Sequence, residues 1–136
     1  MHDVSIIDYK MGAVLNPKDD TFYFGLAYSH DKLKQYDKAI FNYSKVIELD
    51  PNDVSAYNNI ANLYKKEFKD YDKALEYYDK AIEINLTYSL GYINRALFYE
   101  EFKEYDKAIK DYTKAIELEP KNANYYYFRG QFYRHV

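Results

Sequence analysis

The sequence predicts an all-α protein in which pairs of antiparallel helices repeat along the chain. A short phrase, Tyr-Asp-Lys-Ala followed by Ile or Leu, occurs three times, with its alanine at Ala39, Ala74 and Ala108. These alanines are 35 and 34 residues apart, and a fixed period of this size indicates a repeat architecture. Between the phrases apolar residues recur at helical spacing, and three Pro with four Gly are too few for a fold rich in tight turns.

Eight helices account for most of the chain in this prediction, and three of them end before a proline. Pro17, Pro51 and Pro120 each close a helix because proline lacks an amide hydrogen and its ring clashes with the preceding turn. Leu86 stands where a fourth proline is expected, so that turn should be less rigid or be held by packing of Leu86. The expected helices cover residues 2–15, 21–33, 36–49, 54–68, 71–84, 89–102, 105–118 and from about 123 onwards.

The composition limits the class of partner and the compartment. A formal net charge of -3 argues against a dedicated nucleic-acid binder, because phosphate contacts require clustered Lys and Arg. No stretch approaches the roughly 20 apolar residues that span a bilayer, and no signal-peptide core is present, so neither a membrane partner nor secretion is expected. The absence of cysteine excludes disulfides, thiol nucleophiles and cysteine zinc sites. A cytoplasmic location is the expectation that follows.

The repeated pattern resembles the tetratricopeptide repeat, a helix–turn–helix unit of about 34 residues. The resemblance rests on a small residue before each phrase, a tyrosine and a small residue after it, and a closing proline or Leu86. The matching residues are Ala27, Ala61, Ala96 and Gly130; Tyr43, Tyr78 and Tyr112; Val46, Ala81 and Ala115; and Pro51, Leu86 and Pro120. Small side chains suit a close helix crossing, where Leu would overpack at a cost of about 1–3 kcal/mol. The resemblance implies an α-solenoid of antiparallel helix pairs wound into a right-handed superhelix.

The same resemblance divides residues 1–136, expected to form a single domain, into whole and partial repeats. An extra residue, expected in the turn at residues 67–70, explains the 35-residue interval. The expected whole repeats are residues 20–53, 54–88 and 89–122, flanked by the second helix of a partial repeat at 1–19 and the first helix of another at 123–136.

In this family the first helix of each unit lines a concave groove, so the resemblance implies a non-catalytic protein–protein interaction scaffold. Its partner would be another protein or peptide, bound as an extended strand or a helix. A carboxamide can donate to and accept from a peptide bond, so asparagines can hold an extended backbone while aromatic residues supply apolar pockets. The alternative is that these asparagines only make hydrogen bonds between helices. The predicted peptide-binding residues are Phe24, Tyr28, Asn58, Asn59, Asn62, Asn94, Tyr127 and Phe128.

Self-assembly is the second function that the sequence predicts. The last helix is very aromatic, and its inner face has no predicted partner, so head-to-tail docking on the first helix of a second molecule would cover both ends. Such a homo-oligomer grows into a ring or a filament. The alternative is that the chain is a piece of a longer repeat array. The predicted self-association residues are Tyr126, Phe132, Tyr133, Ile6 and Tyr9.

Other functions find less support in the residues. Relatives that clamp a chaperone's C-terminal carboxylate use Lys, Asn and Arg at set groove positions, and this chain has no cation at those positions, so that ligand is not expected. No catalytic motif is present, and no cofactor or metal is expected; a docking subunit of an enzyme is a third reading. The acidic residues near 19–20 and 50–53 are interpreted as helix caps and turns. The clamp positions hold Phe24, Tyr28, Asn59, Leu90 and Asn94, of which only Asn59 fits.

Overall fold

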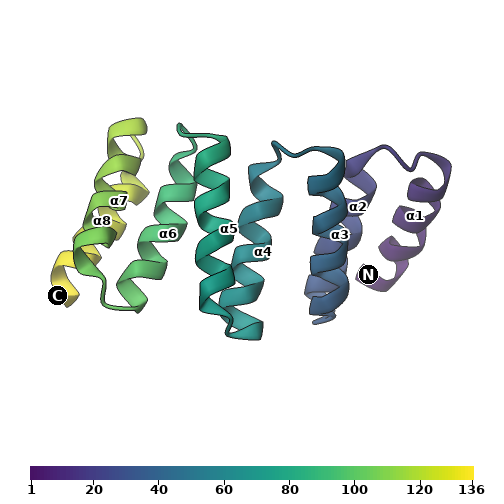
Figure 1. Cartoon of the computed structure of the whole chain (residues 1–136), viewed down its shortest axis with the longest axis horizontal. Helices are drawn as coiled ribbons and strands as arrows, with labels where there is room; N and C mark the ends of the chain where they lie inside the picture. Colours follow the sequence, from purple (N-terminus) through teal and green to yellow (C-terminus); the bar gives the residue numbers. More distant parts are fainter. The chain divides into compact units, whose positions relative to one another are not determined.

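A computed structural model describes all 136 residues, and its regular structure is entirely helical, as the sequence predicted (Figure 1). The elements are α1 (His2–Leu15), α2 (Asp20–Lys32), α3 (Tyr36–Leu49), α4 (Val54–Leu63), the π-helix η1 (Tyr64–Phe68), α5 (Tyr71–Ile84), α6 (Ser89–Glu101), α7 (Tyr105–Leu118) and α8 (Ala123–His135). They fall into two compact units, Met1–Ala74 and Leu75–Val136. None of the helices combines the length and the apolar character needed to cross a membrane.

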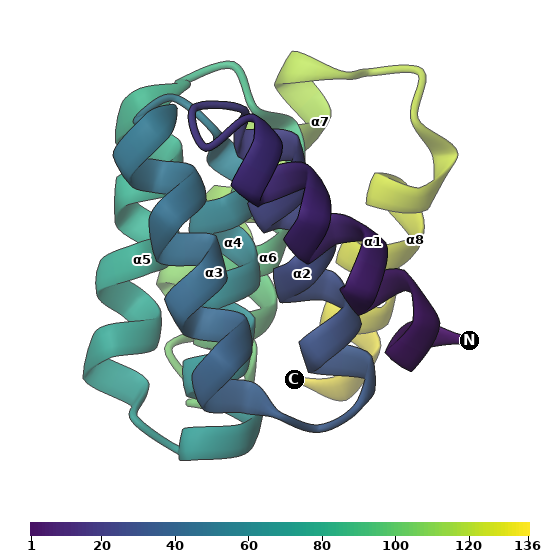
Figure 2. The ribbon, with the colours of Figure 1, turned by 90° about the vertical axis from the view of Figure 1, so that its right-hand side faces the viewer.

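The first unit is a layer of neighbouring helices in which α1 packs on α2, α2 pairs with α3, and α3 contacts α4. Figure 2 shows α1 lying obliquely across α2. Two glycines permit this close approach. A Cβ atom at Gly12 would overlap the ring of Phe22, and one at Gly25 would lie 2.6 Å from the ring of Tyr9. The ring of Phe22 therefore packs against the backbone of α1 at Gly12, and the ring of Tyr9 packs against the backbone of α2 at Gly25.

The small residues predicted at the helix crossings are completely buried. In both units the alanine of each Tyr-Asp-Lys-Ala phrase is inaccessible to solvent, and so is the alanine at the crossing position of the helix before it. These small side chains let the paired helices approach closely. One tyrosine per repeat fills the remaining space and is at most 1% exposed. The residues are Ala27, Ala39, Ala61, Ala74, Ala96 and Ala108 for the crossings, and Tyr43, Tyr78 and Tyr112 for the space between them.

The turn inside each helix pair has one recurring form, which locates the extra residue. Lys34 and Lys103 adopt left-handed conformations with φ of 59° and 60°, and the next residue donates its N–H to a carbonyl five residues back. Lys69 has the same conformation with φ of 54°, but Asp70 donates to the carbonyl of Tyr64, six residues back, at 3.0 Å. The expectation that the extra residue lies in the turn at residues 67–70 is therefore wrong. The chain keeps the turn and widens the preceding helical turn into η1.

The turns between repeats are held by a second set of tyrosines. Tyr126 donates its hydroxyl to the carbonyl of Pro120 at 2.9 Å, and Tyr92 donates to the carbonyl of Leu86 at 3.1 Å. The side chain of Leu86 is 64% exposed, so packing of Leu86 does not hold its turn. Asn85 does so instead, because its carbonyl oxygen accepts from the N–H of Thr87 at 3.1 Å.

Candidate functional site

In the first unit, the predicted groove residues of α2 are aromatic and partly accessible. Tyr28 is 47% exposed, and the Nζ of Lys32 lies 5.0 Å from the centre of its ring. Phe24 is half-buried and stacks edge-on against Tyr43 with 5.4 Å between ring centres. These two residues offer an apolar surface with one cation at its margin.

The three asparagines of α4 do not share one environment. Asn58 is 4% exposed and donates to the carbonyl of Val54 at 3.2 Å, so its side chain is buried in this structure, and its role in peptide binding stays a prediction. Asn59 is half-buried and donates a hydrogen bond to the hydroxyl of Tyr43. Burial raises the pKa of Tyr43 far above its usual value, and this hydrogen bond opposes part of the shift. Asn59 thus links α3 to α4, whereas Asn62 is half-buried one helical turn further on.

Charged residues of both signs border this surface at the ends of α2 and η1. Asp31 is half-buried, and burial raises its pKa, with Lys32 opposing the shift and Glu67 adding to it. Glu67 also accepts a hydrogen bond from the hydroxyl of Tyr36. Lys66 is exposed beside them. The η1 segment therefore brings an acid and a base to the rim of the aromatic surface.

The predicted groove residues of the second unit lie on α6 and α8. Asn94 of α6 and Phe128 of α8 are half-buried, whereas Tyr127 of α8 is 63% exposed. The rings of Tyr127 and Phe128 meet edge-on with 6.2 Å between their centres.

The residues predicted for self-association divide into buried and exposed groups. Ile6 of α1 is 9% exposed, and Phe132 of α8 is 3% exposed with its ring against those of Tyr105 and Tyr112. Both are therefore interior residues in this structure, and their role in self-association stays a prediction. Tyr9 of α1 is half-buried against Gly25 of α2. The exposed members are Tyr126 and Tyr133 of α8, at 45% and 59%.

The sequence pattern did not predict the strongest ionic cluster, which lies in the second unit. Arg95 of α6 makes two hydrogen bonds to Asp111 of α7, at 2.7 and 2.8 Å, and one to Asp79 of α5 at 2.8 Å. Burial opposes the charge of Arg95, yet the hydrogen bonds to the two aspartates outweigh it and raise its pKa. A cavity of about 550 Å³ adjoins Arg95 and runs along α7. The sequence did contain a signal for this cluster, because Arg95 occupies a repeat position that holds Leu26 and Ile60 in the first unit.

The outer face of α1 is a second surface that the sequence pattern did not predict. Val4, Ile7, Met11 and Val14 are each at least 58% exposed, and their spacing places them in one stripe. The equivalent positions of α5 and α7 carry only Lys and Glu: Lys73, Glu76, Lys80 and Glu83, and Lys107, Lys110, Lys114 and Glu117. The first helix is therefore apolar on both its buried and its outer face.

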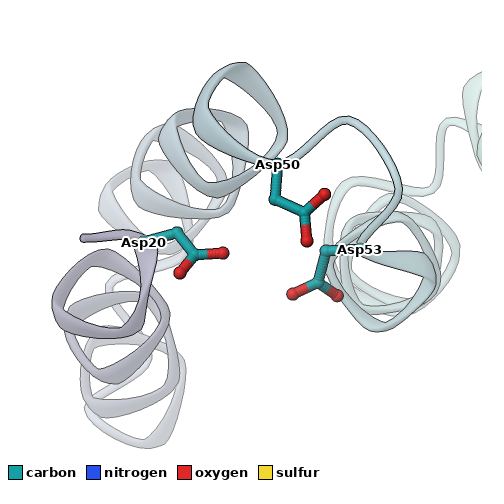
Figure 3. A group of neighbouring side chains, drawn as sticks. All are labelled: Asp20, Asp50 and Asp53. Carbon is teal, nitrogen blue, oxygen red and sulfur yellow. The ribbon is translucent and has the colours of Figure 1, made fainter. Parts of the chain in front are cut away.

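Three carboxylates of the first unit converge where α2 begins and α3 gives way to α4 (Figure 3). Asp20, Asp50 and Asp53 place their oxygens within 4.8 Å of one another. Asp53 accepts from the N–H of Ala56 at 3.0 Å and Asp50 accepts from the N–H of Asn52 at 3.0 Å. The cap and turn interpretation accounts for both residues, and acidic side chains beside two helix N-termini are favoured by the helix dipoles.

Repeated helix pairs, nested at alanines and presenting varied side chains on their outer surfaces, define the class of helical-repeat interaction modules. Comparison with family models matches a TPR repeat over residues 30–67 and tetratricopeptide repeats over residues 54–88 and 89–122. The chain belongs to the tetratricopeptide repeat family. The expected repeat boundaries remain a prediction.

Solved structures of the same fold agree with this assignment. A crystal structure of MamA is similar with a TM-score of 0.76 and 28% identity, over 88% of this chain and 69% of that one. The Arabidopsis OM64 TPR domain has a TM-score of 0.72 and 24% identity, over 86% and 96% of the two chains. The first TPR of Spaghetti (RPAP3), bound to an HSP90 peptide, has a TM-score of 0.72 and 24% identity, over 85% and 91%. No curated protein sequence matches the chain.

Proposed function

We propose that this chain is an interaction scaffold that binds an extended peptide or a short helix along the first helices of its repeats. The observation that carries the proposal is the surface of α2 and α4 in the first unit. It combines an exposed ring, Tyr28, with a half-buried ring, Phe24, and the half-buried carboxamide of Asn62. Aromatic contact area with a few polar groups is the composition typical of peptide-binding surfaces.

The chemistry of this surface favours a ligand bound through apolar side chains over one bound through a terminal carboxylate. The positions that would hold a carboxylate carry Phe24, Tyr28 and Asn59 in the first unit, and none of them is a cation. The domain of RPAP3 in the comparison is bound to an HSP90 peptide. For this chain we expect a different peptide, with an apolar side chain against Tyr28.

The test is a selection of peptides from a random displayed library on the intact chain, followed by affinity measurements on substituted chains. Tyr28→Ala should weaken the selected peptides about tenfold or more, because exposed aromatic anchors carry much of the binding energy of such surfaces. The matched control is Phe41→Ala, which removes a ring that is 62% exposed on α3, and it should leave affinity unchanged. Equal losses in the two variants, or a library that yields no binder, would refute groove binding.

Asparagine substitutions need a different choice from the one that the sequence suggests. Asn59→Ala would remove the hydrogen bond to Tyr43 and so change stability together with binding. Asn62→Ala, on the half-buried Asn62 of α4 in the same unit, should be compared with Tyr28→Ala for the same peptides. A loss of affinity at unchanged thermal stability would support capture of the peptide backbone by carboxamides.

A further inference from the structure

We propose that the open face of α8 is a docking site for α1 of a second copy of this chain, with Asp8 of one copy paired to Arg129 of the other. The inference does not depend on the groove, because it uses different faces of the repeats. It names the residues and the register through which the chain would associate head-to-tail.

The open face of α8 is the one that is covered in the other pairs. Its small residue is Gly130, equivalent to Ala96 of α6, which is fully buried beneath α7. A Cβ atom at Gly130 would meet no other atom within 4 Å. Tyr126 and Tyr133, which lie on either side of it along the helix, are 45% and 59% exposed. In this structure no helix lies across that surface.

On this face Arg129 has only one of the two polar partners that the equivalent Arg95 has. Arg129 directly precedes Gly130, as Arg95 directly precedes Ala96. Arg95 receives one carboxylate from the preceding helix, Asp79, and a second from the paired helix, Asp111. Arg129 makes one hydrogen bond, to Thr113, the equivalent of Asp79, at 3.5 Å, and its guanidinium lies 5.9 Å from the centre of the Tyr126 ring, but no carboxylate pairs with it.

The missing carboxylate is present on α1. Ser5 is equivalent to Ala108, so Asp8 is equivalent to Asp111, three residues further along its helix. Asp8 is exposed and has no partner in the chain. If α1 of a second copy lay on α8 as α7 lies on α6, Asp8 would face Arg129. Opposite charges at matching repeat positions identify the second copy as the occupant.

The face of α1 that this contact needs has small residues at the crossing and already contacts α2. Ser5 and Gly12 are half-buried there, and both are small enough for a close crossing. A helix in this position can contact two neighbours at once. In α3 the single residue Tyr43 touches Phe24 of α2 and accepts a hydrogen bond from Asn59 of α4.

The experiment is sedimentation equilibrium of the intact chain at concentrations up to about 1 mM, with charge-reversed variants. The native chain should associate, and Asp8→Arg or Arg129→Asp alone should raise the dissociation constant about tenfold or more. An equimolar mixture of the two variants should associate again, because each contact in an alternating assembly then joins opposite charges. The matched control, Asp3→Arg, makes the same charge change at an exposed residue of the same helix and should associate like the native chain.

Three results would overturn the proposal. The native chain could remain monomeric throughout the concentration range, the two reversed variants could associate as well as the native chain, or their mixture could fail to recover association. Circular dichroism of each variant excludes unfolding as the cause, and both substituted side chains lie at the surface or at its margin. Peptide binding by Asp8→Arg should equal that of the native chain, which separates this test from that of the groove.

Discussion

The ionic cluster at Arg95 offers the sharpest test of the packing in the second unit. Arg95→Leu removes three hydrogen bonds and leaves Asp111, which is 6% exposed, as a carboxylate without a cation. Breaking a buried ion pair from one side costs about 3–5 kcal/mol. Asp79 is 42% exposed, so Asp79→Ala should cost less than about 1 kcal/mol. Most of the loss should therefore come from the unpaired Asp111.

Urea unfolding followed by circular dichroism measures these free energies, and a double variant gives the decisive comparison. Arg95→Leu with Asp111→Leu replaces both charges by apolar side chains, so it should be more stable than Arg95→Leu alone by at least about 1–2 kcal/mol. The control is Lys45→Met at the exposed pair with Glu48, which should change stability by less than about 0.5 kcal/mol. A double variant no more stable than Arg95→Leu, or a single variant that costs no more than the control, would refute the assignment.

The remaining predictions concern backbone, titration and helix crossing. Lys34→Gly should stabilise by about 0.5–1 kcal/mol in urea unfolding, because Lys34 is left-handed, whereas Lys38→Gly in α3 should destabilise by about 1 kcal/mol; equal effects would contradict this. Burial and the hydrogen bond to a carboxylate raise the pKa of Tyr112 above 10, so its stabilisation is complete below about pH 10 and is lost above it. Tyr112→Phe should flatten the fall in stability between about pH 10 and 11.5 by up to 1.4 kcal/mol per pH unit, and an unchanged slope would count against this. Gly130→Ala should raise the melting temperature and Gly12→Ala should lower it, because only the second Cβ overlaps an aromatic ring; a fall in both would contradict an open face on α8.

The fold was predictable because its determinants are local and repeated. The alanine at each crossing and the tyrosine that follows it recur in the printed sequence, and burial of Ala39, Ala74 and Ala108 follows from that recurrence. The π-helix was not predictable, since an inserted residue can enter either the turn or the helix before it. The turn before α5 keeps its closing hydrogen bond and its left-handed Lys69. The last helical turn before it changes only from α-type to π-type hydrogen bonding. An extra residue before Lys69 therefore leaves the turn, which is the more specifically defined of the two, unchanged.

The candidate site was less predictable because side-chain partners depend on contacts between helices. Periodicity placed Asn58 and Asn59 near the groove, but in the folded chain Asn58 is buried, and the packing of α3 on α4 brings Asn59 to Tyr43. Ile6 and Phe132 were expected at bare ends, yet α2 and α7 cover them. Arg95 carried no motif, and its two aspartates lie sixteen residues away on either side. Such pairs cannot be read from a helical period alone.

Residues that recur between the repeats determine the fold, and residues that vary between them are the candidates for partner recognition. Residues that recur, such as Ala108 and Tyr112, are buried, so their chemistry is fixed by packing and cannot select a partner. Tyr28 is accessible, and the equivalent positions of α4 and α6 hold Asn62 and Leu97, so the surface changes character from repeat to repeat. Under the proposed function, a peptide on the first unit meets a ring at Tyr28 of α2 and a carboxamide at Asn62 of α4. Partner choice should therefore reside in the positions where the repeats differ, and substitutions there should change binding with little change in stability.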